Sequence, residues 1–222
     1  GLQAVTDGEF RRRYWHLDFL ADLDGVEEIK AYHWSVHFKG HQPKAATLKI
    51  TDKIDFGNHP FVEHFKYLQS IGQDTLCKMT IPSPSMLHLI CCVRSEEYTP
   101  IKRYEDMDVL YHDIAIAYQK AIRAFYDAGC RYLQLDDTSW GEFCDANKRK
   151  AYNKRGLDLD KIAKSYVDMI NLALEAKPKD MTITMHICRG NFRSTWFSSG
   201  GYEPVAEILF GHCKVDGFFL EY

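Results

Sequence analysis

Apolar and polar positions along this chain form short runs that predict β-strands. Residues 47–56 (Thr-Leu-Lys-Ile-Thr-Asp-Lys-Ile-Asp-Phe) alternate with a period of two, as expected for a strand with one buried face. Short apolar runs predict further strands at residues 3–6, 74–81, 130–135, 181–188 and 217–222. The chain is therefore expected to contain six strands.

Apolar residues spaced three and four apart predict helices between most of these strands. The clearest helix contains an apolar row from Leu110 to Phe125, and Gly129 stands where a C-terminal cap belongs. Asp158 is a suitable N-terminal cap for a second helix, which has one apolar face and is followed by Pro178. Two further helices are expected at residues 60–70 and 202–211, and the least regular stretches are 24–46 and 87–106.

Strands separated mostly by helices, without hairpin turn signals between them, indicate parallel βαβ units. Two α/β architectures are compatible with this order, a doubly wound sheet and a (β/α)8 TIM barrel. A doubly wound sheet would favour a glycine-rich phosphate loop after a strand, and the sequence contains none. Barrel active sites are built at the carboxyl ends of the strands. Polar residues that could bind a metal or a substrate stand at the carboxyl ends of the predicted strands: Glu9, Asp136, His186, Cys188 and Glu221.

We therefore predict one α/β domain over residues 1–222, an incomplete (β/α)8 barrel with strands two to seven present. The chain opens at Gly1 and stops at Tyr222 inside a predicted strand, so we expect it to be a fragment of a longer protein.

Composition narrows the class of partner. A net charge of −3 without a basic stripe argues against binding to nucleic acid or to a membrane surface. No apolar run approaches a membrane span, and no signal-peptide pattern is present in the sequence. Seven cysteines without regular spacing fit a reducing cytoplasm better than a disulfide framework. Small-molecule partners and a cytoplasmic location are expected.

His186 and Cys188 are the most informative pair of residues. Residues two apart on a strand project to the same face, so the imidazole and the thiol can converge on one point. A nitrogen and a thiolate sulfur together suit zinc better than magnesium or calcium. Taken alone, such a pair is more often a buried histidine and an inert cysteine. The metal interpretation therefore depends on the acidic residues that end the other strands.

Four segments together resemble the cobalamin-independent methionine synthase family, and most closely its short, single-domain members similar to the C-terminal catalytic barrel. The segments are Val-Thr-Asp-Gly-Glu-Phe-Arg-Arg (5–12), Tyr-Leu-Gln-Leu-Asp-Asp (132–137), His-Ile-Cys-Arg-Gly-Asn (186–191) and Phe-Phe-Leu-Glu-Tyr (218–222). The resemblance implies a zinc ion held by His186, Cys188 and Glu221. It places a fourth ligand, a cysteine on the next strand, beyond residue 222.

The resemblance also implies substrate contacts, with Glu9 and Asp136 holding the amino group of homocysteine. The implied activity is transfer of a methyl group to the homocysteine thiol, which gives methionine. The donor would be 5-methyltetrahydrofolate or a related compound. The sequence departs from the family pattern at three positions on the donor side, where Asp7, Asp137 and Thr138 replace His, Glu and Pro. The alternatives are a zinc-dependent barrel hydrolase and a non-catalytic, zinc-stabilised binding protein.

Two other groups of residues allow a functional interpretation. Three histidines at intervals of four could mimic a helical metal site, but Gly40 and Pro43 predict an irregular insertion there: His33, His37 and His41. Three aromatic residues near strand ends could stack on a flat methyl donor or pack in the core: Trp15, His16 and Trp140.

Overall fold

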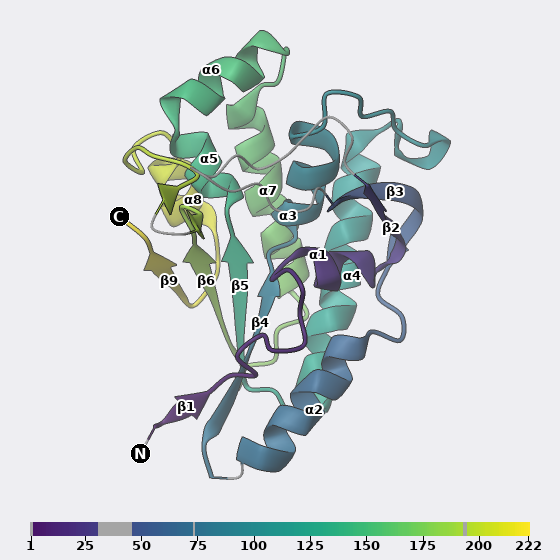
Figure 1. Cartoon of the computed structure of the whole chain (residues 1–222), viewed down its shortest axis with the longest axis vertical. Helices are drawn as coiled ribbons and strands as arrows, with labels where there is room; N and C mark the ends of the chain where they lie inside the picture. The colour runs from purple at the N-terminus through teal and green to yellow at the C-terminus, as the bar shows by residue number, and fades with distance from the viewer. Residues whose placement is uncertain (1, 31–45, 73, 193–194) are drawn as a thin grey trace.

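A curled sheet of five parallel strands forms the centre of the structure, a computed structural model that describes residues 2–30, 46–72, 74–192 and 195–222 (Figure 1). The strand order is β1-β4-β5-β6-β9. The bounds are Ala4–Val5 for β1, Leu76–Pro82 for β4, Tyr132–Asp137 for β5, Thr182–Ile187 for β6 and Gly217–Leu220 for β9. The molecule is thus a mixed α/β protein whose sheet is consistent with part of a barrel.

The two faces of this sheet differ in chemistry. On one face Met79, Ile81, Leu133, Leu135 and Met185 are buried almost completely and belong to the main core. The long helices α4 (Met107–Asp127) and α7 (Leu159–Leu174) lie behind the sheet and contribute apolar residues to the same core (Figure 1). The opposite face carries mostly polar side chains, because successive residues of a strand point to opposite sides.

The helix ends follow the signals in the sequence. The Asp158 side chain accepts a hydrogen bond from the Lys161 amide at 3.0 Å and caps α7. Gly129 has φ +98° just after α4, a left-handed conformation that favours glycine. The predicted helices at 60–70 and 202–211 correspond to α2 (Pro60–Gly72) and α8 (Ala206–His212).

The prediction of six parallel strands is wrong in one respect. Residues 47–56 do form a strand, β3 (Ala46–Asp55), but it pairs antiparallel with β2 (Asp24–Lys30) in a separate hairpin. Strict alternation marks a strand with one buried face, which is typical of antiparallel pairs, whereas parallel strands are covered on both faces. The partner β2 lies in the stretch 24–46 that the sequence predicts to be irregular, and only Val26 in this strand is buried. The prediction for His33, His37 and His41 lies outside the described residues.

Shorter elements connect the strands. The stretch predicted as irregular, 87–106, contains the end of α3 (Ser85–His88), a π-helix η1 (Leu89–Val93) and a 3-10 turn η2 (Lys102–Tyr104). The remaining elements are α1 (Leu17–Ala21), α5 (Ser139–Cys144), α6 (Ala146–Lys154), β7 (Asn191–Phe192) and β8 (Thr195–Trp196). In the part of the chain that the structure describes, none of the seven cysteines forms a disulfide. Among the described residues, no helix combines the length and apolarity needed to cross a bilayer.

Candidate metal and substrate site

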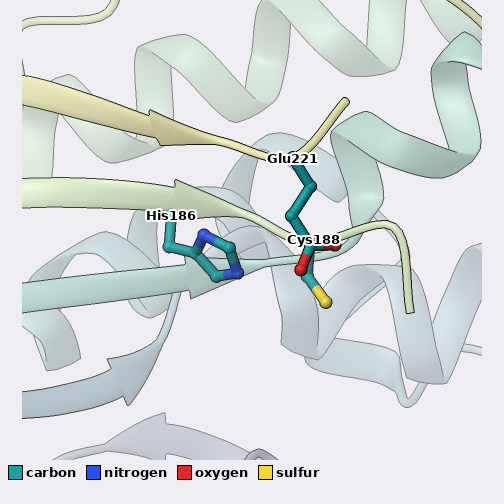
Figure 2. Close-up of side chains that lie close together, drawn as sticks. All are labelled: His186, Cys188 and Glu221. Carbon is teal, nitrogen blue, oxygen red and sulfur yellow. The ribbon is translucent and has the colours of Figure 1, made fainter. Parts of the chain in front are cut away.

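The carboxyl ends of β6 and β9 bring three potential metal ligands together. His186 lies near the end of β6, Cys188 follows that strand, and Glu221 follows β9. One donor atom from each side chain lies within 4.8 Å of the other two, and all three residues are half-buried (Figure 2). This is the convergence that the two-residue spacing of His186 and Cys188 predicts.

The backbone orients the imidazole of His186. Its Nδ1 lies 3.1 Å from the carbonyl oxygen of Phe219, the residue that pairs with it across the sheet. Because a carbonyl only accepts, Nδ1 must carry the proton in this contact, and a neutral ring then has its lone pair on Nε2. Figure 2 shows the other ring nitrogen on the side of Cys188 and Glu221. A hydrogen bond of this kind commonly fixes the tautomer of a metal-binding histidine.

Backbone amides donate hydrogen bonds to the side chains of Cys188 and Glu221. The Gly190 amide donates to Cys188 Sγ at 3.2 Å, and the Arg189 amide donates to Glu221 Oε2 at 2.6 Å. Gly190 has φ +71°, and a Cβ there would lie 2.5 Å from Cβ of Phe197, so this loop requires glycine. The loop after β6 thus places two backbone amides against the side chains of Cys188 and Glu221.

Glu9 sits in a strained turn after β1. Gly8 and Glu9 have φ of +61° and +56°, and Glu9 is the one non-glycine residue with positive φ among the residues that the structure describes. The conformation is supported by Thr6 Oγ1 and Asp7 Oδ1, which accept from the Gly8 and Glu9 amides at 3.1 and 3.0 Å. A left-handed non-glycine residue costs on the order of 1–3 kcal/mol, and such strain tends to occur at functional sites.

Arg12 connects this turn to the neighbouring strand. Its guanidinium lies 3.4 Å from Glu9 Oε1 and 3.6 Å from Asp7 Oδ2, and it donates to the carbonyl of Thr80 at 2.7 Å. Thr80 Oγ1 also donates to Glu9 Oε1 at 3.1 Å. Arg12 is not among the residues that the sequence pattern predicts for the site. In the structure Arg11 and Arg13 are exposed while Arg12 turns inward, a difference that three consecutive arginines in a sequence do not reveal.

Asp136 is buried near the end of β5, where the charges of Glu9, Arg12 and His186 act on it. Burial raises its pKa from 3.8 to about 6. The Glu9 carboxylate also raises this pKa, while the hydrogen bond from Gln134 and the charges of His186 and Arg12 lower it. Thr80, which donates to Glu9, pairs with Gln134, and Asp136 pairs with His186, so Glu9, Asp136 and the metal-ligand candidates lie at one edge of the sheet. A cationic partner beside Asp136 would favour its ionised form.

Asp137 has a different environment from Asp136. It is completely buried, accepts from the Ser139 amide at 2.7 Å, and binds the hydroxyls of Ser139 and Ser85. Burial raises its pKa. These contacts hold the start of α5 against the Pro82–Ser85 turn, so Asp137 supports the fold near the site.

The three aromatic candidates, Trp15, His16 and Trp140, differ in their environments. Trp140 is fully buried and packs against Phe143 and Tyr166, so it belongs to the core. Burial lowers the pKa of His16 to about 3, with the Arg94 charge as a second cause, and the ring stays neutral at physiological pH. The Trp15 and His16 rings lie 4.4 Å apart between centroids.

Comparison with known proteins gives similarity over the whole chain. No protein-family profile matches it. Two uncharacterized proteins of Bacillus subtilis (strain 168), YxjG and YxjH, are each 47% identical over 222 residues, which is all of this chain and 57% of each relative. The methionine synthase of Saccharolobus solfataricus is 22% identical over 205 residues, covering 86% of this chain and 48% of that protein.

Two solved structures are also similar. A Listeria monocytogenes protein provisionally described as a vitamin-B12-independent methionine synthase superposes with a TM-score of 0.75 and 48% identity, covering 100% of this chain and 57% of that one. A B12-independent methionine synthase from Shewanella sp. W3-18-1, solved with selenomethionine, superposes with a TM-score of 0.61 and 17% identity, covering 87% and 49%. At that identity the second likeness concerns the fold alone. The chain thus spans about half the length of these relatives, between 48% and 57%.

Proposed function

We propose that this chain carries the zinc and amino-acid site of a cobalamin-independent methionine synthase, a methyltransferase that methylates the thiol of homocysteine to give methionine. The observation that supports this most is the meeting of His186, Cys188 and Glu221 within 4.8 Å. The Listeria and Saccharolobus proteins, named for this activity, and the selenomethionine complex of the Shewanella enzyme agree with it. The activity belongs to the longer protein of which such a chain would be part.

The residues fit a zinc ion. Nitrogen, sulfur and carboxylate oxygen are the usual zinc donors, and around a tetrahedral ion they stand roughly 3–4 Å apart. A spread of 4.8 Å is within reach of small side-chain rotations. Catalytic zinc sites keep a position for the substrate beside three protein ligands. A zinc ion held there would stabilise the thiolate form of the substrate thiol, the form that attacks a methyl group.

The surrounding residues would orient the amino acid. Glu9 and Asp136 supply two carboxylates for the substrate ammonium group, and Arg12 holds Glu9 in place. With a pKa of about 6, Asp136 is mostly ionised at neutral pH. Positioning of the thiol and the donor supplies much of the rate of such a displacement. The donor we propose is 5-methyltetrahydrofolate or a related compound; the second choice is included because Asp7, Asp137 and Thr138 depart from the family pattern on the donor side.

The central claim is tested by metal content. The protein should bind about one zinc ion per chain, and Cys188→Ser should lower the zinc content sharply while circular dichroism shows an intact fold. Cys213→Ser, which removes a half-buried thiol at the end of α8, is the matched control and should keep its zinc. Unchanged zinc stoichiometry in Cys188→Ser would contradict the proposal.

X-ray absorption with and without homocysteine then separates the proposed activity from the alternatives. A methyltransferase should show an added sulfur neighbour of zinc when homocysteine is present. A spectrum unaffected by homocysteine would instead support a closed structural site or a hydrolytic one.

A further inference from the structure

A lysine side chain lies on the polar face of the sheet, next to the proposed substrate site. Lys78 in β4 alternates with the buried residues Met79 and Ile81, so it faces the polar side together with Gln134 and Asp136 of β5. Strands β4 and β5 lie side by side (Figure 1). Its Nζ donates to Gln134 Oε1 at 2.5 Å. The same ammonium lies 4.8 Å from the centre of the Tyr132 ring and 5.1 Å from that of Phe219. Two aromatic faces and one amide oxygen therefore hold the cation in place.

This contact decides which way the Gln134 amide points. An ammonium group has donors and no acceptor, so the amide oxygen must face Lys78. The amide nitrogen is then turned toward Asp136 and donates to Oδ1 at 2.6 Å. If the amide were reversed, its oxygen would meet the Asp136 carboxylate and its NH2 group would meet the Lys78 ammonium, and both contacts would be repulsive.

We propose that Lys78 is a positioning residue for the ammonium group of the amino-acid substrate, acting through Gln134 on Asp136. The inference rests on the proposed function, because it takes Asp136 as a ligand of that ammonium group. Lys78 holds the amide, the amide holds one carboxylate oxygen, and the carboxylate plane is thereby set before the substrate arrives. Such preorganisation removes the ordering that binding would otherwise require.

The chain offers a clean way to test this. Lys78→Met keeps an unbranched apolar stem beside Tyr132 and Phe219 but removes the donor, so the Gln134 amide becomes free to turn. Lys78→Arg keeps a cationic donor and should restore much of the effect. Lys120→Met is the matched control, because Lys120 is a half-exposed lysine on α4, one of the helices behind the sheet, and pairs with Asp55.

The measurement is calorimetric binding of two thiols to the zinc-loaded proteins: homocysteine, and 4-mercaptobutyrate, which lacks the amino group. Lys78→Met should bind homocysteine roughly tenfold more weakly, the range expected for a weakened contact to a charged group. Its zinc content and its affinity for 4-mercaptobutyrate should stay as in the wild type, and Lys120→Met should match the wild type throughout.

Each other outcome has one reading. Equal weakening of both thiols, or loss of zinc, would make Lys78 a purely structural residue and overturn the inference. Homocysteine affinity unchanged in Lys78→Met would overturn it while the proposed function stands. If the wild type does not bind homocysteine more tightly than 4-mercaptobutyrate, the proposed binding site for the ammonium group is wrong.

A second variant covers the case in which Lys78→Met does not fold. Gln134→Glu keeps a partner for Lys78 but puts a carboxylate beside Asp136. It should weaken homocysteine binding and spare 4-mercaptobutyrate, and unchanged homocysteine binding would overturn the inference.

Discussion

At the scale of single residues, the candidate site contains two carboxylates whose conformation or burial costs free energy. Glu9 has a left-handed backbone, and Asp136 is a carboxylate whose pKa burial raises to about 6. Neither feature benefits folding by itself. Both would be offset by a cation placed between the two carboxylates, which is what the ammonium group of an amino acid supplies.

Glu9→Gln and Asp136→Asn should therefore keep zinc and weaken binding of homocysteine. Each variant loses a charge-assisted contact to the ammonium group, worth about 1.5–3 kcal/mol. Titration calorimetry measures the loss, with 4-mercaptobutyrate as the control ligand that both variants should bind normally. Loss of zinc in either variant would show instead that the replaced carboxylate contributes to metal binding.

Asp136 should also make stability depend on pH. Its pKa is 3.8 in the unfolded chain and about 6 in the folded protein, so between these values the folded state binds more protons. The free energy of unfolding should then fall as pH rises through this window, and the cost is fully present above about pH 6. Asp136→Asn removes the charge and should be more stable than the wild type at pH 8, on the order of 2 kcal/mol.

This comparison is made by urea denaturation of chelator-treated protein, because bound zinc would add its own charge near Asp136. The advantage of Asp136→Asn should shrink toward pH 4. An advantage that is the same at pH 4 and pH 8 would show that the carboxylate charge is not its cause.

At the scale of elements, the helices behind the sheet hold the strand ends in place. Helix α7 packs its apolar face, with Tyr166 and Ile170 fully buried, into the core that also contains Ile183 and Met185 of β6. Strand β6 ends at His186 and Ile187, so the position of the imidazole depends on this packing. Stability of α7 is therefore relevant to the site even though no residue of α7 belongs to it.

Asp158→Ala should lower the free energy of unfolding by about 1 kcal/mol, because it removes the N-terminal cap of α7. Asp160→Ala, in the first turn of the same helix, removes only an exposed ion-pair partner of Arg149 and should cost less than about 0.5 kcal/mol. Urea midpoints of the two variants decide the point. Equal effects would mean that charge at the helix start, rather than the cap, is what matters.

At the scale of the whole molecule, the site is assembled from strand ends that are distant in the chain. Glu9 follows β1, Asp136 ends β5, Cys188 follows β6 and Glu221 follows β9. A bound zinc ion would tie the loop after β6 to the segment after β9, so the ion should stabilise the fold as well as the site.

Removal of zinc should lower the melting temperature of the wild type. By mass action, free zinc at about 100 times its Kd stabilises a protein by about 2.7 kcal/mol. Differential scanning calorimetry with and without a chelator measures the shift. The chelator should have little effect on Cys188→Ser, and an equal shift in both proteins would locate the bound metal elsewhere.

Local patterns in the sequence were enough to predict most elements and part of the site. Apolar runs located every strand of the parallel sheet, and Asp158 and Gly129 marked two helix ends correctly. The two-residue spacing of His186 and Cys188 predicted that both side chains would project to one side, and their donor atoms do converge. These features depend on residues a few positions apart, which share one element and one period.

Only the tertiary structure decided which elements are neighbours and which polar groups meet. The strand 46–55 leaves the parallel sheet for a hairpin with 24–30, and β1 pairs directly with β4. The contact of Arg12 with Thr80 joins residues 68 positions apart, and that of Lys78 with Gln134 joins residues 56 apart. Periodicity reports whether a residue is buried but not its partner, because pairing depends on the packing of the whole core. The polar chain from Lys78 to Asp136 therefore exists only once β4 and β5 lie side by side.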